Sequence, residues 1–85
     1  MNEGKLRDEV SRGARAQALL GNAMLKEAFD ALEKEYIDAW RGTKPNDDTV
    51  REKMFQLLRA LDALKQHLTM IVQSGELAAK ELTRL

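Results

Sequence analysis

The side chains able to do chemistry in this sequence are few and widely spaced. His67 is the only imidazole, and the 85 residues contain no cysteine. A hydrolase triad needs a base beside a nucleophile, and a zinc site needs three or four ligands. The glycines form no phosphate-cradling loop, and the Glu-x-x-His pattern of carboxylate metal sites in helical bundles does not occur. The sequence therefore predicts a protein that is not an enzyme and that uses no cofactor or metal.

Basic side chains gather near the N-terminus. Lys5, Arg7, Arg12 and Arg15 fall within eleven residues, and a helix could turn several of them toward phosphate groups. Three acidic residues are interspersed, so residues 1–21 carry a net charge of +1 (four basic, three acidic), and no aromatic side chain is interleaved for base stacking. A small nucleic-acid-binding module that uses Arg7, Arg12 and Arg15 is therefore kept as an alternative function.

Length and charge limit the remaining classes. A chain of 85 residues makes one domain at most, and folding hides only about 60% of its unfolded surface. Fourteen basic and fourteen acidic residues give zero net charge, which argues against a general binder of nucleic acid or anionic membranes. No apolar run approaches the roughly 20 residues of a membrane span, so no membrane partner is expected. The prediction is one domain over residues 1–85.

The clearest periodicity lies between residues 49 and 74. Apolar residues recur there at alternating spacings of four and three, which is the heptad pattern of a helix that packs along one face. This heptad seam consists of Val50, Met54, Leu57, Leu61, Leu64, Leu68 and Ile71. Asp47, Asp48 and Thr49 are all suitable N-caps for this helix, and Thr49-x-x-Glu52 has the form of a capping box. Gly75 is expected to end the helix.

A second helix is predicted over 22–41, with an apolar face that includes Phe29, Tyr36 and Trp40. The connection over 42–48 contains the only proline. A link this short between two amphipathic helices predicts an antiparallel helical hairpin.

Weaker patterns flank the hairpin. Residues 1–21 are expected to form an arm or a short helix, because glycine dilutes their apolar stripe. That stripe consists of Leu6, Val10, Ala14 and Leu20. Residues 76–85 are expected to form a short C-terminal helix. The predicted fold class is thus all-α, a hairpin with short helices at both ends.

Two helices alone leave large apolar side chains in water. Phe55 and Trp40 lack partners within one hairpin, and each exposed large side chain forfeits about 1.5–3 kcal/mol relative to burial. The first segment could cover part of this surface as a third helix; otherwise a second chain must cover it. The favoured prediction is a homo-oligomeric bundle. Its self-association residues are Leu57, Leu61, Leu64, Leu68 and Ile71, with Phe29, Tyr36 and Trp40 opposite.

The turn carries a short motif. Trp40-Arg41-Gly42 places W-x-G at the bend of the predicted hairpin. In this respect the chain resembles the WXG100 family, whose members are small dimeric hairpins exported by type VII secretion. The family's C-terminal Tyr-x-x-x-Asp/Glu signal is missing, because Tyr36 is the only tyrosine and precedes the turn. The alternative reading is that Trp40 closes the end of the hairpin and that Gly42 ends its helix.

A broader pattern covers about residues 12–82. It consists of the strings Arg12-Gly13-Ala14-Arg15-Ala16, Leu19-Leu20-Gly21-Asn22, Glu27-Ala28-Phe29, Ala39-Trp40, Asp47-Asp48, Arg51-Glu52, Ala60-Leu61 and Gly75-Glu76-Leu77-Ala78. In these strings the chain is similar to small helical proteins of tailed phages and prophages. That group often has proline after the Asn at the second helix start, where this chain has Ala23. The resemblance implies a phage origin near head-assembly and DNA-packaging genes, and it implies no catalytic residues.

These observations combine into one predicted function. The chain is expected to be a non-catalytic, self-associating phage protein, an adaptor or accessory in head assembly or DNA packaging. Its expected partners are further copies of itself and other phage structural or packaging proteins. Its expected location is the cytoplasm of the bacterial host or the virion. The alternatives are the nucleic-acid-binding module and a WXG100-like secreted dimer.

Overall fold

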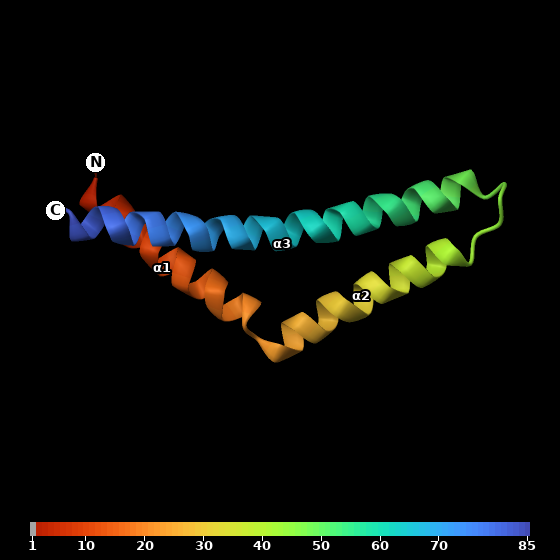
Figure 1. Cartoon of the computed structure of the whole chain (residues 1–85), viewed down its shortest axis with the longest axis horizontal. Coiled ribbons are helices and arrows are strands. Elements are labelled where there is room, and N and C mark those ends of the chain that lie inside the picture. Colours follow the sequence, from red (N-terminus) through yellow and green to blue (C-terminus); the bar gives the residue numbers. More distant parts are fainter. Residues whose placement is uncertain (1) are drawn as a thin grey trace. The chain divides into compact units, whose positions relative to one another are not determined.

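The computed structural model describes residues 2–85 and contains three α-helices (Figure 1). They are α1 (Glu3–Leu20), α2 (Ala23–Arg41) and α3 (Asp48–Thr83). No strand occurs among the described residues, so the predicted all-α class is confirmed.

Helix α2 ends where the backbone leaves the helical path at the W-x-G motif. The amide of Gly42 still donates to the carbonyl oxygen of Asp38 at 3.0 Å, but Thr43 already turns back. Its amide donates to the Trp40 carbonyl at 3.1 Å, and its hydroxyl donates to the same oxygen at 2.7 Å. These bonds satisfy carbonyl groups that a helix end otherwise leaves unpaired.

The start of α3 lies one residue before the expected capping box. Asp47 precedes the helix, and its carboxylate accepts a hydrogen bond from the amide of Lys44 at 2.9 Å, which holds the turn. Its carbonyl oxygen accepts the first helical bond, from the Arg51 amide at 3.0 Å. Thr49 is therefore inside the first turn, and the Glu52 carboxylate accepts from the Gln56 side chain.

Helix α3 runs without a break through Ser74–Gly75, which corrects the expected stop at Gly75 and the expected separate helix over 76–85. The physical reason is visible in the spacing of buried positions. After Ile71 the four-three alternation continues through Gly75, Ala78 and Leu82, all of them buried or half-buried. Gly75 thus occupies a packing position of the heptad seam, and its φ is not positive, as a left-handed helix cap would require.

The chain divides into two compact units that share α3. The central unit is Ala23–Lys65, which contains α2 and the first half of α3. The terminal unit combines the chain before Ala23, with α1, and Gln66–Leu85, the second half of α3.

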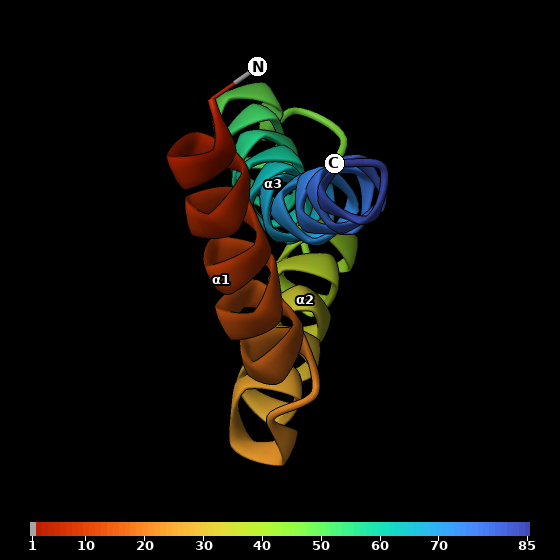
Figure 2. The ribbon, with the colours of Figure 1, turned by 90° about the vertical axis from the view of Figure 1, so that its left-hand side faces the viewer.

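In the terminal unit α1 packs against the second half of α3 (Figure 2). The two helices meet at two glycines, Gly13 and Gly75. A Cβ atom on Gly13 would lie 2.9 Å from the Cα of Gly75, and a Cβ atom on Gly75 would lie 2.9 Å from the Cα of Gly13. Around this crossing Leu6, Ala16 and Ala78 are only 5%, 4% and 2% exposed. The two backbones therefore approach more closely than any side chain at the crossing would permit.

The packing face of α1 includes Leu6, Val10 and Leu20 of the expected stripe, which are buried or half-buried, but it does not include Ala14. Gly13 and Ala16 are buried, whereas Ala14 is exposed. The segment is a helix of 18 residues, longer than the expected arm or short helix. Glycine lowers helix propensity, but here it permits the close contact with α3 that holds the segment in place.

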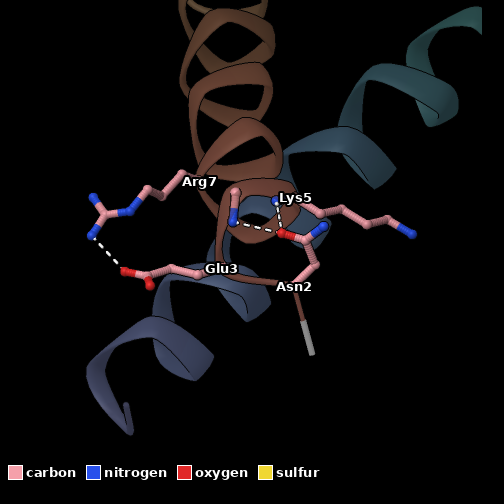
Figure 3. A network of polar contacts seen from close by, with 5 residues as sticks. Asn2, Glu3, Lys5 and Arg7 are labelled. Carbon is pink, nitrogen blue, oxygen red and sulfur yellow. Dashed lines mark hydrogen bonds and ion pairs between the residues drawn. The ribbon is translucent and has the colours of Figure 1, made fainter.

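The first turn of α1 is capped by a side chain (Figure 3). The Asn2 side-chain oxygen accepts hydrogen bonds from the amides of Gly4 at 2.9 Å and Lys5 at 3.3 Å. One turn along, the Arg7 guanidinium donates to the Glu3 carboxylate at 2.9 Å, on the exposed surface. The cap satisfies two of the amides that a helix start leaves without partners.

Asn2→Ala should loosen this first turn and leave the rest of the chain unchanged. Loss of an Asn cap costs about 1 kcal/mol, which corresponds to roughly fivefold more frequent opening. Amide hydrogen exchange at Gly4 and Lys5 is the measurement. Asn2→Asp retains the accepting oxygen and is the control, so equal acceleration in both variants would contradict the capping role.

The central unit is held by contacts between α2 and the first half of α3. Near the turn, the Arg51 guanidinium lies 5.4 Å from the centre of the Trp40 ring. At the other end the Lys65 ammonium lies 5.8 Å from the Phe29 ring centre and 3.8 Å from the Glu33 carboxylate. Such exposed cation–π contacts contribute about 0.5–1 kcal/mol each.

No helix in the described part of the chain has the length and apolar character needed to cross a membrane.

Candidate functional site

The heptad seam is only partly covered. Leu61 is 8% exposed, and it is the one buried side chain among residues 23–65. Leu57, Leu68 and Ile71 are half-buried, whereas Leu64 is 49% exposed. On α2, Phe29 and Tyr36 are half-buried, and Trp40 is exposed.

Large apolar side chains reach solvent on every helix. Those that are exposed are Leu19, Met24, Leu32, Trp40, Val50, Phe55, Leu64, Met70, Leu77 and Leu85. The buried apolar residues of the described chain are Leu6, Ala16, Leu61 and Ala78, and two of these four are alanines. The surface is thus rich in apolar side chains that could be covered by another molecule.

Two of the three arginines of the expected nucleic-acid site lie together. Arg12 and Arg15 flank an open apolar depression in the terminal unit, and Leu19 lies beside them. Arg7 is not part of it, because its guanidinium pairs with Glu3. We call this depression the basic groove; it is lined by Arg12, Arg15, Ala16, Leu19, Leu68 and Ile71.

A second depression lies in the central unit beside the turn. Trp40 and Phe55 form its apolar part, and Phe55 is 54% exposed. Asp48, Glu52 and Arg51 form its polar part, with the Arg51 guanidinium placed over the indole. We call this the aromatic patch. The sequence predicts that Phe55 and Trp40 lack partners within one hairpin. It does not predict that the carboxylates of Asp48 and Glu52 lie beside them.

The polar side chains of the described residues are exposed or half-buried. No set of three or more His, Asp or Glu side chains is arranged to hold a metal ion among residues 2–85. His67 is exposed, and no polar side chain in this part of the chain is buried. The arrangements that the structure does provide are apolar surfaces bordered by charge, which are suited to binding other macromolecules.

Comparison with known protein families, with curated proteins and with solved structures finds no match for this chain.

Proposed function

We propose that this chain is a non-catalytic helical protein that works as a self-associating assembly component. The observation that carries this proposal is the exposure of large apolar side chains on all three helices. Burying one such side chain stabilises a structure by about 1.5–3 kcal/mol, so association of several of them gives a substantial driving force. Copies of the same chain can supply the missing cover.

The proposed oligomer is a bundle built on an antiparallel hairpin of α2 and the first half of α3. The order of contacts supports this geometry. Trp40 at the end of α2 lies beside Arg51 at the start of α3, and Phe29 near the start of α2 lies beside Lys65. Leu57, Leu61, Leu64 and the half-buried residues that follow would then lie in the shared interior.

Within this class, the proposed role is that of an adaptor or accessory in phage head assembly or DNA packaging. The support is the resemblance of residues 12–82 to small helical proteins of tailed phages. The proposed partners beyond its own copies are phage structural or packaging proteins. The proposed location is the cytoplasm of the bacterial host or the virion.

Leu64→Asp tests the self-association. Light scattering on a sizing column should give the wild type a stable multiple of the 9.6 kDa chain mass. The variant should fall to a single chain mass and keep its helical circular dichroism, because Leu64 is already 49% exposed within one chain.

Gln66→Asp is the matched control for Leu64→Asp. It places the same charge two residues further along α3, at a polar and exposed position, and should leave the mass of the assembly unchanged. A wild type that stays at one chain mass at every concentration would refute the proposed function.

A further inference from the structure

The basic groove and the aromatic patch have linings of opposite charge. The groove has two arginines as its only polar lining, around Leu19, Leu68 and Ile71. The patch presents two aromatic rings beside two carboxylates and one guanidinium. The formal charges of the linings are therefore +2 for the groove and −1 for the patch.

The groove lacks an occupant from its own unit. Leu19 is 49% exposed although Ala16, one turn earlier on α1, is only 4% exposed. Leu19 therefore presents an apolar side chain that an incoming group can cover. The guanidinium groups of Arg12 and Arg15 on the border favour an occupant that brings carboxylates or aromatic faces.

The patch has the composition of an interface anchor. Trp40 is 42% exposed and Phe55 is 54% exposed, and aromatic side chains of this kind commonly dominate binding energy. Asp48 and Glu52 lie one turn apart on α3, so both carboxylates border the rings. The Arg51 guanidinium is placed over the indole, and the Glu52 carboxylate accepts a hydrogen bond from the neutral Gln56 side chain, so both carboxylates keep a negative charge that an incoming cation can meet.

We propose that the aromatic patch of one copy docks into the basic groove of a second copy. Phe55 and Trp40 would cover Leu19, Leu68 and Ile71, while Asp48 and Glu52 would face Arg12 and Arg15. This inference rests on the proposed self-association and specifies its surfaces: Leu68 and Ile71 of the heptad seam line the groove, and Leu64 lies one turn before Leu68 on α3. We call this contact head-to-tail, because each copy contributes a different surface. Two copies can make it reciprocally in a closed dimer, and repetition in one direction joins more copies into a ring or a filament.

The alternative pairing of like surfaces is disfavoured. Groove against groove would bring together two linings of formal charge +2, and patch against patch would bring together two linings of formal charge −1. Like charges placed against each other cost several kcal/mol and suppress the wrong arrangement.

A complementation experiment tests this contact. Leu19→Asp blocks the groove and leaves the patch, whereas Phe55→Asp blocks the patch and leaves the groove. Both positions are about half exposed, so each variant should keep its helical circular dichroism. Each variant alone should have one chain mass, 9.6 kDa. An equimolar mixture should form a dimer of twice that mass and nothing larger, because only one intact groove and one intact patch remain.

A charge exchange adds an independent control. Arg12→Glu with Arg15→Glu should break the assembly, as should Asp48→Lys with Glu52→Lys, and all four changes in one chain should restore it. Lys5→Glu with Arg7→Glu makes the same charge change on α1 away from the groove and should have no effect. A wild-type oligomer whose blocked variants remain assembled, or do not combine in the mixture, would overturn the head-to-tail contact and leave self-association standing. A monomeric wild type would overturn both.

Discussion

Leu61→Asp is expected to unfold most of the chain at room temperature. Leu61 is 8% exposed and is the one buried side chain among residues 23–65. The substitution removes about 1.5–3 kcal/mol of apolar burial and adds several kcal/mol for an unpaired charge in a buried position. The free energy of unfolding of a protein is roughly 0.05–0.15 kcal/mol per residue, so the total for a small domain is not much larger than this loss. Far-ultraviolet circular dichroism should lose more than about half of its helical signal.

Two control variants show whether the effect comes from the loss of the buried Leu61 side chain or from any substitution in α3. Leu61→Met conserves volume and should cost less than about 1.5 kcal/mol, so the helical signal should remain. Leu64→Asp introduces the same charge at a position that is 49% exposed and should keep the helix. Equal loss of helicity in Leu61→Asp and Leu64→Asp would contradict the assignment of Leu61 as the buried contact of the central unit.

Gly75→Leu is expected to release α1 from α3 while α3 stays helical. Leucine favours the helix over glycine by about 0.8–1 kcal/mol, so α3 itself gains. Its Cβ, however, would lie 2.9 Å from the Gly13 Cα and 3.1 Å from the Glu9 carbonyl oxygen, both backbone atoms. The helices must separate, and the burial of Leu6 is lost. Hydrogen exchange should show α1 amides at least about tenfold less protected, with α3 amides as protected as before.

The matched control is Gly21→Ala, which adds a side chain just after α1. A Cβ there has ordinary contacts, the nearest at 3.5 Å to the Gln17 carbonyl oxygen, and the backbone φ of −86° suits any residue. Protection of α1 should stay the same or rise slightly. If Gly75→Leu left α1 protected, the close glycine contact would not be what holds the two helices together.

The sequence predicted best where the signal is local. The helix over Ala23–Arg41 and the turn after it depend on an amphipathic repeat, a glycine and an Asp-rich cap. These features act through neighbours within a few residues, so their effect can be read from spacing alone. The all-α class follows from the same repeat.

The roles of Gly13 and Gly75 could not be predicted from their neighbours in the sequence. A glycine near the end of an apolar repeat has the same appearance whether it caps the helix or admits a neighbouring backbone. The role of Gly75 is decided by its contact with Gly13, which lies 62 positions earlier in the sequence (75 minus 13). One signal did exist in the chain, since the four-three alternation continues through Ala78 and Leu82.

The candidate surfaces could be predicted only in part. The seam and the aromatic residues near the turn were visible as apolar positions, but their exposure depends on what covers them. Leu61 and Leu64 belong to the same repeat, and one is buried while the other is half exposed. Likewise, Arg12 and Arg15 gain an apolar neighbour in Leu68 only through the packing of α1 on α3.

The continuity of α3 has a consequence for how the chain folds. The first turn of a helix is costly, with a nucleation parameter of about 10⁻³ that corresponds to about 4 kcal/mol, whereas each further residue adds on easily. Each unit contains one half of this helix of 36 residues. Whichever unit folds first therefore supplies a helix end that the other can extend without a new nucleus. The shared helix thus couples the folding of the two units through the backbone.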